Sequence, residues 1–384
     1  MPRSGPWPLD VRILGVDVIP LRAPLTPPRG PSVHTYHRRE TLFIKLQTDA
    51  GLVGWGETYR LAGVEGALRD VLAPLLLDRD PLHLRTLHAE MRGATFDNGF
   101  AVGGMDLALH DVVGKAFGVP VHQLYGGALR ARVEAYASLA GYYDDREPEG
   151  HWLDEAQELV AHGFRGLKFR IGRFDPRREL PILSDLRRAV GRDVRLMADA
   201  NAAYSPEQSL RMANGLRELD FEWLEEPLPQ SGYLGYPELR IKIPLPLAGG
   251  EGLLNRVAAC NSLERGCFDI VQPDVSICGG IGETLFIGEL ARLSTVRCIP
   301  HCWAGALTFA ATLHVCALLP AMTRLPGNAE PLLEFDVTDN PFRDDVVVGD
   351  PFALRDGMLS VPQGAGLGIE IDENALRRYG AQCA

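Results

Sequence analysis

The chain has 384 residues, a formal net charge of −11 at pH 7 and a hydrophobic fraction of 46%. This length suits a large domain with a smaller one beside it, and the apolar content is that of a globular protein. A chain this acidic has no general electrostatic attraction for nucleic acid or for an anionic membrane surface, so we expect neither as a partner.

The start of the chain and its cysteines favour a cytoplasmic location. Residues 1–7 contain no apolar core of the signal-peptide kind, and no uninterrupted apolar run approaches the length of a membrane span. The seven cysteines all lie between Cys260 and Cys383, and their odd number and scattered spacing do not form a disulfide framework. We therefore expect a protein of a reducing compartment that does not span a membrane.

Residues 1–130 predict a small α+β domain. The proline-rich stretch 20–31 predicts a loop, because proline removes a backbone donor. The alternating segments 41–48 and 52–57 flank a turn at Gly51 and predict a hairpin. Apolar residues at helical spacing predict three helices, over 63–77, 81–92 and 102–117.

Residues 131–340 predict a parallel (β/α)8 barrel, because short apolar strands alternate there with amphipathic helices. The expected strands are 133–137, 166–171, 194–198, 221–224, 245–248, 270–272, 295–299 and 331–335. Residues 341–384 are rich in turns, with a strand-like piece at 358–361, and we expect them to pack back on the N-terminal domain. The predicted fold class is α/β, a modified TIM-type barrel with an α+β cap.

Charged or polar residues stand at or just beyond the end of almost every predicted barrel strand. The carboxyl ends of barrel strands meet at one mouth, where barrel enzymes have their active sites. We therefore expect these side chains to gather there: Lys168, Arg170, Asp199, Asn201, Glu225, Glu251, Asp274, His301 and Glu334.

Three of these carboxylates predict a metal site. Asp199, Glu225 and Glu251 follow one another at a spacing of 26 residues, about one βα unit, so they belong to consecutive strands. Three carboxylates brought together repel one another, and a hard divalent cation relieves that repulsion. Magnesium, one ion per site, is the natural candidate. Lys168 and Arg170 are two residues apart on one strand and both point into the mouth, where they could also be structural partners of these carboxylates.

Several motifs resemble the enolase superfamily, and specifically its mandelate racemase and muconate lactonizing enzyme branch. They are Gly54-Trp55-Gly56-Glu57, the helix around 104–111, the polar strand ends, and the C-terminal return. The resemblance implies an α+β capping domain over a modified barrel, and a homo-oligomer. The stretches 330–336, 340–343 and 364–369 resemble members that act on acid sugars or their lactones, including galactarolactone cycloisomerase-like enzymes.

The resemblance also implies roles for individual residues. Asp199, Glu225 and Glu251 match the magnesium ligands. Asp274 and His301 match a dyad in which the carboxylate orients the imidazole base. Glu334 and Asn201 match substrate contacts, and Lys168 matches the first lysine of a paired-lysine motif. His34 and Tyr36 are further candidates for substrate contacts, because the resemblance places them in a specificity loop; a solvated polar loop is the equal alternative. Trp303 is also a candidate, and it either lines the substrate pocket or caps the barrel.

Arg170 departs from the family pattern, because two-base members carry a second lysine there. Arginine keeps its proton far above neutral pH and is a poor general base. We therefore expect His301 to remove the α-proton of a carboxylate substrate as the only base. The leading hypothesis is magnesium-dependent dehydration of an acid sugar to a 2-keto-3-deoxy acid. The alternatives are a lactone cycloisomerase, a racemase or epimerase, a metal-free barrel enzyme and a catalytically silent binding protein.

Overall fold

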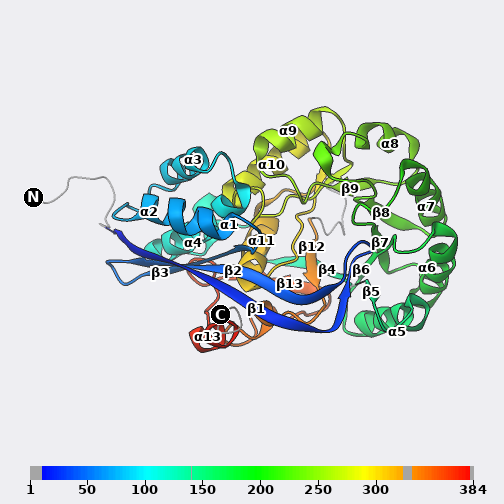
Figure 1. The fold of residues 1–384 in the computed structure, drawn as a ribbon, viewed down its shortest axis with the longest axis horizontal. Helices are drawn as coiled ribbons and strands as arrows, with labels where there is room; N and C mark the ends of the chain where they lie inside the picture. Colours follow the sequence, from blue (N-terminus) through cyan, green and yellow to red (C-terminus); the bar gives the residue numbers. More distant parts are fainter. Residues whose placement is uncertain (1–10, 140, 323–330, 381–384) are drawn as a thin grey trace, which may run out of the picture.

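The computed structural model describes residues 11–139, 141–322 and 331–380, so the predictions that concern residues 1–7, Glu330 and Cys383 lie outside the described residues. Two sheets organise the fold, and Figure 1 shows the smaller one running along one side of the larger. The smaller sheet is antiparallel in the order β3-β2-β1-β5. Its strands are β1 (Ile13–Gly30), β2 (Tyr36–Thr48), β3 (Val53–Tyr59) and β5 (Tyr142–Tyr143).

The predicted hairpin is present as β2 and β3, but the predicted loop at 20–31 is wrong. Those residues belong to the long strand β1, which pairs with β2 as far as Pro24↔Arg38 and, after a register shift, again at Arg29↔Tyr36. In the described part of the chain, the other edge of β1 pairs only with the short β5, at Arg29 and Gly30. Proline is tolerated in such an edge strand, because its missing N–H leaves no ladder bond unmade. Tyr36, which the sequence analysis places in a loop, is instead the first residue of β2.

The helices of the cap are where the apolar periodicity predicts them. They are α1 (Val64–Gly66), a π-helical turn (Ala67–Leu72), α2 (Ala73–Leu76), α3 (Leu84–Ala94) and α4 (Gly99–Phe117). Helix α4 packs tightly against β3. A side chain at Gly56 would collide with the backbone at Gly104 and Ala108, so the glycines of the Gly54-Trp55-Gly56 motif let the strand and the helix approach closely.

The larger sheet has eight parallel strands in the order β11-β10-β9-β8-β7-β6-β4-β12, which curl into the predicted barrel. The strands are β4 (Arg132–Ser138), β6 (Gly166–Arg170), β7 (Arg195–Asp199), β8 (Phe221–Glu225), β9 (Leu247–Gly249), β10 (Ile270–Val271), β11 (Arg297–Cys298) and β12 (Leu333–Asp336). All eight coincide with predicted segments to within a few residues.

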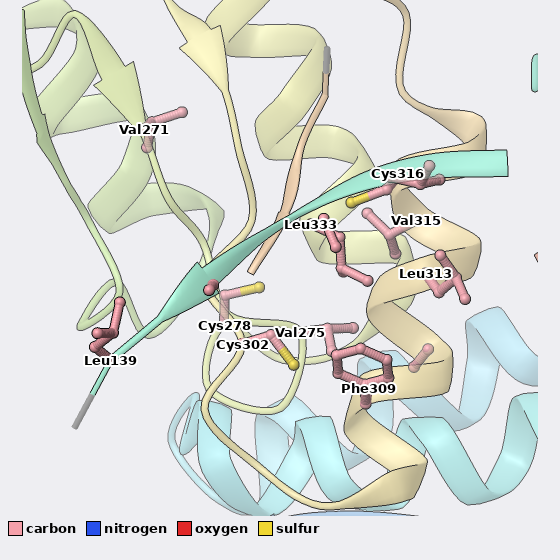
Figure 2. Packing of buried hydrophobic residues seen from close by; sticks show 14 of the residues in the cluster. Leu139, Val271, Val275, Cys278, Cys302, Phe309, Leu313, Val315, Cys316 and Leu333 are labelled. Carbon is pink, nitrogen blue, oxygen red and sulfur yellow. The ribbon is translucent and has the colours of Figure 1, made fainter. Parts of the chain in front are cut away.

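Helices connect consecutive barrel strands and cover the outside of the barrel (Figure 1). They are α5 (Pro148–Ala161), α6 (Pro176–Val190), α7 (Pro206–Glu218), α8 (Tyr236–Lys242), α9 (Arg256–Glu264), α10 (Ile281–Leu293) and α11 (Ala306–Leu318), with short 3-10 turns at Val121–Tyr125 and Ser231–Tyr233. Figure 2 shows Phe309, Val315 and Cys316 of α11 packed near Leu333 of β12 and the loop residue Cys302. This packing fixes the chain immediately after His301.

The C-terminal segment contacts both parts of the molecule. It contains α12 (Pro341–Asp344), β13 (Met358–Ser360) and α13 (Glu373–Gly380). The expected strand is present, but β13 pairs with β4 of the barrel. Helix α13 packs against β1, and Glu373 forms an ion pair with Lys45 of β2 at 2.7 Å, so this helix is one of the parts of the segment that return to the cap.

Three buried acids connect the cap to the rest of the chain. Glu57 of β3 accepts hydrogen bonds from the backbone of Gly305 and Thr308, at the start of α11. Asp106 of α4 accepts from the backbone N–H of Ile281, at the start of α10. Asp111 accepts from Trp55 and Leu367. Backbone N–H groups at a helix start have no intrahelical acceptor, so Glu57 and Asp106 satisfy them and hold the cap over the barrel, while Asp111 ties the cap to the C-terminal segment.

Two further expectations concern cysteines and membranes. The six cysteines within the described residues are all free. No helix in the described part of the chain is long and apolar enough to cross a membrane.

Candidate active site

The parallel register of the barrel strands brings their polar ends to one mouth. Arg170 of β6 lies beside Asp199 of β7, and Asp199 lies beside Glu225 of β8. Lys168 and Arg170 are both at least 93% buried, while Phe169 between them packs outward against Trp152 of α5. The alternation along β6 therefore places both cations on the inner side, as the sequence predicts.

Asp274 and His301 form a hydrogen-bonded pair. Nδ1 of His301 lies 2.8 Å from Oδ2 of Asp274, whose other oxygen accepts from the backbone N–H and the hydroxyl of Ser276 at 2.8 and 2.7 Å. A carboxylate in this position favours the tautomer with the proton on Nδ1, so Nε2 is the atom available to take a proton. Nε2 lies 3.4 Å from Oε2 of Glu251.

The surroundings of His301 are anionic. Burial lowers its pKa, but the charges of Glu251 and Glu334 and the hydrogen bond to Asp274 outweigh burial and raise the pKa to about 10. His301 therefore holds a proton firmly as long as these carboxylate charges are not balanced by a cation.

Lys168 lies between two buried carboxylates. Its ammonium group is 2.5 Å from Oε1 of Glu225 and 2.8 Å from Oε1 of Glu334. Burial lowers the pKa of Lys168, but these two charges raise it well above its usual value, so the lysine stays protonated. Lys168 thus forms an ion pair with the metal-ligand candidate Glu225, as the sequence analysis allowed. Glu334 belongs to the same charged cluster.

Asn201 connects the metal-ligand candidate Asp199 to Arg170. Its backbone takes a left-handed conformation with φ of 45°, which asparagine tolerates better than most residues. Its backbone N–H and its Nδ2 both donate to Asp199, at 2.9 and 3.1 Å, and its Oδ1 accepts from Arg170 at 3.3 Å. Asn201 therefore orients both the carboxylate and the guanidinium.

The three predicted metal ligands fit a hard cation by their donor chemistry and their charge. Burial raises the pKa of Asp199 and of Glu225. The negative charge of Glu251 raises the pKa of Asp199 further, and the charge of Asp199 does the same to Glu225. Positive charge near these oxygens would relieve that cost. Among the described residues, the carboxylate oxygens of these three acids are not arranged around a common metal position. Glu225 is turned to Lys168, Trp223 and Gln272, and Glu251 to His301 and Gln230.

A cavity of about 300 Å³ opens above His301 between the barrel mouth and the cap. Glu251, Arg170 and His301 form its barrel side, with Trp303 beside them, and Tyr36 reaches it from β2. The Trp303 ring lies 5.4 Å from the Tyr36 ring and 5.2 Å from the Arg170 guanidinium. Trp303 and Tyr36 therefore line the pocket. The exposed His34 packs edge-on against Tyr36 at 4.7 Å and is not among the cavity-lining residues.

Sequence reasoning missed four residues that support this site. Tyr59, at the end of β3, donates its hydroxyl to Oδ2 of Asp274 at 3.0 Å. Gln272 and Trp223 donate to Oε2 of Glu225 at 2.8 and 3.1 Å. Arg39 of β2 forms an ion pair with Asp336 at 2.6 Å and lies over the Trp303 ring. The alternation of β3 indicates that Tyr59 shares a face with Glu57, but no local pattern indicates its partner across the domains.

Comparison with known proteins places this geometry in a family. Residues 13–126 match the family model of the mandelate racemase / muconate lactonizing enzyme N-terminal domain, and residues 151–375 match the enolase C-terminal domain-like model. The chain is 34% identical over 351 residues to D-galactarolactone cycloisomerase of Agrobacterium fabrum, covering 90% of this chain and 92% of that protein.

Two other relatives carry related names. Arabinonate dehydratase of Saccharolobus solfataricus is 31% identical over 353 residues, which cover 89% of this chain and 91% of that protein. The crystal structure of 3,6-anhydro-D-galactonate cycloisomerase from Zobellia galactanivorans superposes with a TM-score of 0.85 at 29% identity, covering 96% of this chain and 99% of that one. The names of these relatives cover both dehydration and cycloisomerisation.

Proposed function

The chain belongs to the enolase superfamily of enzymes, in its mandelate racemase and muconate lactonizing enzyme branch, and on that premise we propose that it removes the proton next to the carboxylate of an acid sugar and expels the β-oxygen. The observation that carries the proposal is the hydrogen-bonded pair of His301 and Asp274, whose imidazole lines the same cavity as the buried cation Arg170. A base and a buried cation that line one small cavity suit enolisation of a carboxylate.

The magnesium site is part of this proposal. Asp199, Glu225 and Glu251 would hold one ion at the strand ends. When bound there, the ion supplies positive charge that stabilises the enediolate, as is general for this superfamily. With a cation balancing the carboxylate charges around His301, the pKa of the imidazole would fall toward neutral. The unprotonated imidazole that a general base requires would then be available.

The protein side chains divide the remaining work by their charge. His301 takes the α-proton at Nε2, while Asp274 holds Nδ1. Lys168 and Arg170 both keep their protons, so they stabilise the negative charge that develops on the substrate oxygens without acting as bases. One base on one face favours elimination over racemisation, which needs an acid and a base on opposite faces.

Dehydration is the reaction that we propose first. The α-proton and the β-hydroxyl leave together as water, and the remaining enol becomes a 2-keto-3-deoxy acid. Opening of a lactone by loss of the ring oxygen is the second candidate, supported by the 34% identity to a galactarolactone cycloisomerase. Both reactions begin with the same proton removal, but only the first changes the molecular formula.

The experiment is an incubation with magnesium and a panel of aldonic acids, aldaric acids and aldaric lactones, read by mass spectrometry and by an assay for 2-keto acids. A keto acid one water lighter than its substrate supports dehydration. A ring-opened product with the same mass as its lactone substrate supports cycloisomerisation. If neither appears, and no deuterium from the solvent enters the α-carbon, the proposal is wrong.

A further inference from the structure

The cap side of the active-site cavity is rich in arginine, although the chain as a whole has a net charge of −11. Within the described residues, the cap contributes Arg38 and Arg39 of β2 and Arg60, just after β3, to the cavity wall, and one acid, Glu40. Arg39 is buried and its charge is balanced by the ion pair with Asp336. The other two arginines both contact Glu40, and Arg60 also lies 3.9 Å from Glu65, so Arg38 is the arginine of this wall whose contacts leave most of its guanidinium open.

Arg38 is the member of this wall that is most open to a ligand. Its side chain is 58% exposed, and its Nε donates to Oε2 of Glu40 at 2.9 Å. The two terminal nitrogens of its guanidinium donate no hydrogen bond to any of the described residues. The same Glu40 also accepts from Arg22 at 3.0 Å and from Arg60 at 3.1 Å. Glu40 therefore orients Arg38 through Nε and leaves the two terminal nitrogens of this cavity-lining residue for a ligand.

We propose that Arg38 binds a second carboxylate of the substrate, so that the acid sugar is a dicarboxylic acid or a lactone derived from one. This inference rests on the proposed function, in which the reacting carboxylate lies beside Lys168 and Arg170 at the barrel end of the cavity. A guanidinium presents two parallel N–H donors to a carboxylate, and Arg38 has its two terminal nitrogens for that purpose.

The dimensions and lining of the cavity suit such a ligand. A volume of about 300 Å³ is at the small end of ligand sites and fits a short sugar acid. The rings of Tyr36 and Trp303, which line the same cavity, offer apolar surface to the carbon chain. A monocarboxylic sugar would place a neutral hydroxymethyl group beside Arg38 and would not use its charge.

The test compares matched acids in the full-length enzyme with magnesium: galactarate and its lactone against galactonate, and further aldarate and aldonate pairs of equal configuration. For the diacid, Arg38→Gln should lower kcat/KM by about 10- to 100-fold, chiefly by raising KM. For the monoacid, it should change kcat/KM by less than about twofold. The matched control is Arg22→Gln, because Arg22 also binds Glu40 but does not line the cavity.

Each outcome decides the inference. A loss confined to the diacid and to the Arg38 variant supports it. The inference is overturned if the wild type prefers the monoacid, if Arg38→Gln affects both acids equally or neither, or if Arg22→Gln has the same effect as Arg38→Gln. In each of these cases turnover of any acid leaves the proposed function standing. Absence of turnover for every acid, by contrast, refutes the proposed function and this inference with it.

Discussion

The hydroxyl of Tyr59 lies 3.0 Å from Oδ2 of Asp274, the same oxygen that lies 2.8 Å from His301. Tyr59 ends a strand of the cap, whereas Asp274 follows a strand of the barrel. The orientation of the proposed base therefore depends on both parts of the molecule, and a change in the cap can affect the dyad without touching the barrel.

Replacing Tyr59 by phenylalanine tests this dependence. The variant removes one donor from the shared oxygen and leaves the ring in place, so we expect kcat to fall by about 3- to 30-fold with little change in KM. Tyr379→Phe is the control, because that hydroxyl binds Asp345 on the C-terminal segment. Equal kcat values for the Tyr59 variant and the wild type would show that the bond does not position the dyad.

His301→Asn tests the base. The amide cannot accept the α-proton, so keto-acid formation should fall by about 100- to 10,000-fold while bound magnesium is retained. Both quantities are measured on the same preparation, by turnover and by metal analysis after dialysis. His83→Asn, at an exposed position of the cap, should behave as the wild type. Full activity in the His301 variant would assign proton removal to another group.

Removal of the metal tests the carboxylate cluster. Treatment with a chelator should abolish turnover, and added magnesium should restore it, because the three acids by themselves provide no positive charge for the enediolate. Glu251→Gln should raise the magnesium concentration needed for half-maximal activity by about tenfold or more. Glu238→Gln, on the exposed face of α8, is the matched control. Undiminished activity in chelator would refute the metal requirement and favour a metal-free barrel enzyme.

Glu57 predicts a pH dependence of stability. Burial raises its pKa from 4.5 to about 7, although backbone N–H groups of Thr308 and Gly305 oppose that shift. The folded state thus binds the proton more tightly than the unfolded state, so this group's contribution to stability is lost as the pH rises from about 4.5 to about 7. Relative to the wild type, Glu57→Gln should gain up to about 3 kcal/mol of unfolding free energy across that window.

The measurement for Glu57 is urea unfolding of both proteins at about pH 4.5 and pH 8. The variant lacks the titrating group, so the difference between the two curves, and not either curve alone, carries the result. A difference that stays constant with pH would mean that Glu57 is ionised throughout, held by the backbone donors at the start of α11.

The sequence was sufficient for the barrel and for the position of its polar strand ends. The eight strands could be predicted because each is a short apolar run between turns and helices, and the strand ends carried the polar residues. Lys168 and Arg170 could be assigned to the inner face because alternation along a strand is a local property. The long strand β1 could not be predicted, since its prolines indicate a loop unless the free edge of the sheet is known.

What the sequence by itself determined is therefore the periodic part of this protein: the alternation of strands and helices, and the chemical type of the residue at each strand end. Only the tertiary structure decided which side chains meet across domains, such as Tyr59 with Asp274, Arg39 with Asp336 and Glu57 with the start of α11. Such contacts join residues far apart in the chain, so no local spacing encodes them; they arise from the packing of the cap on the barrel.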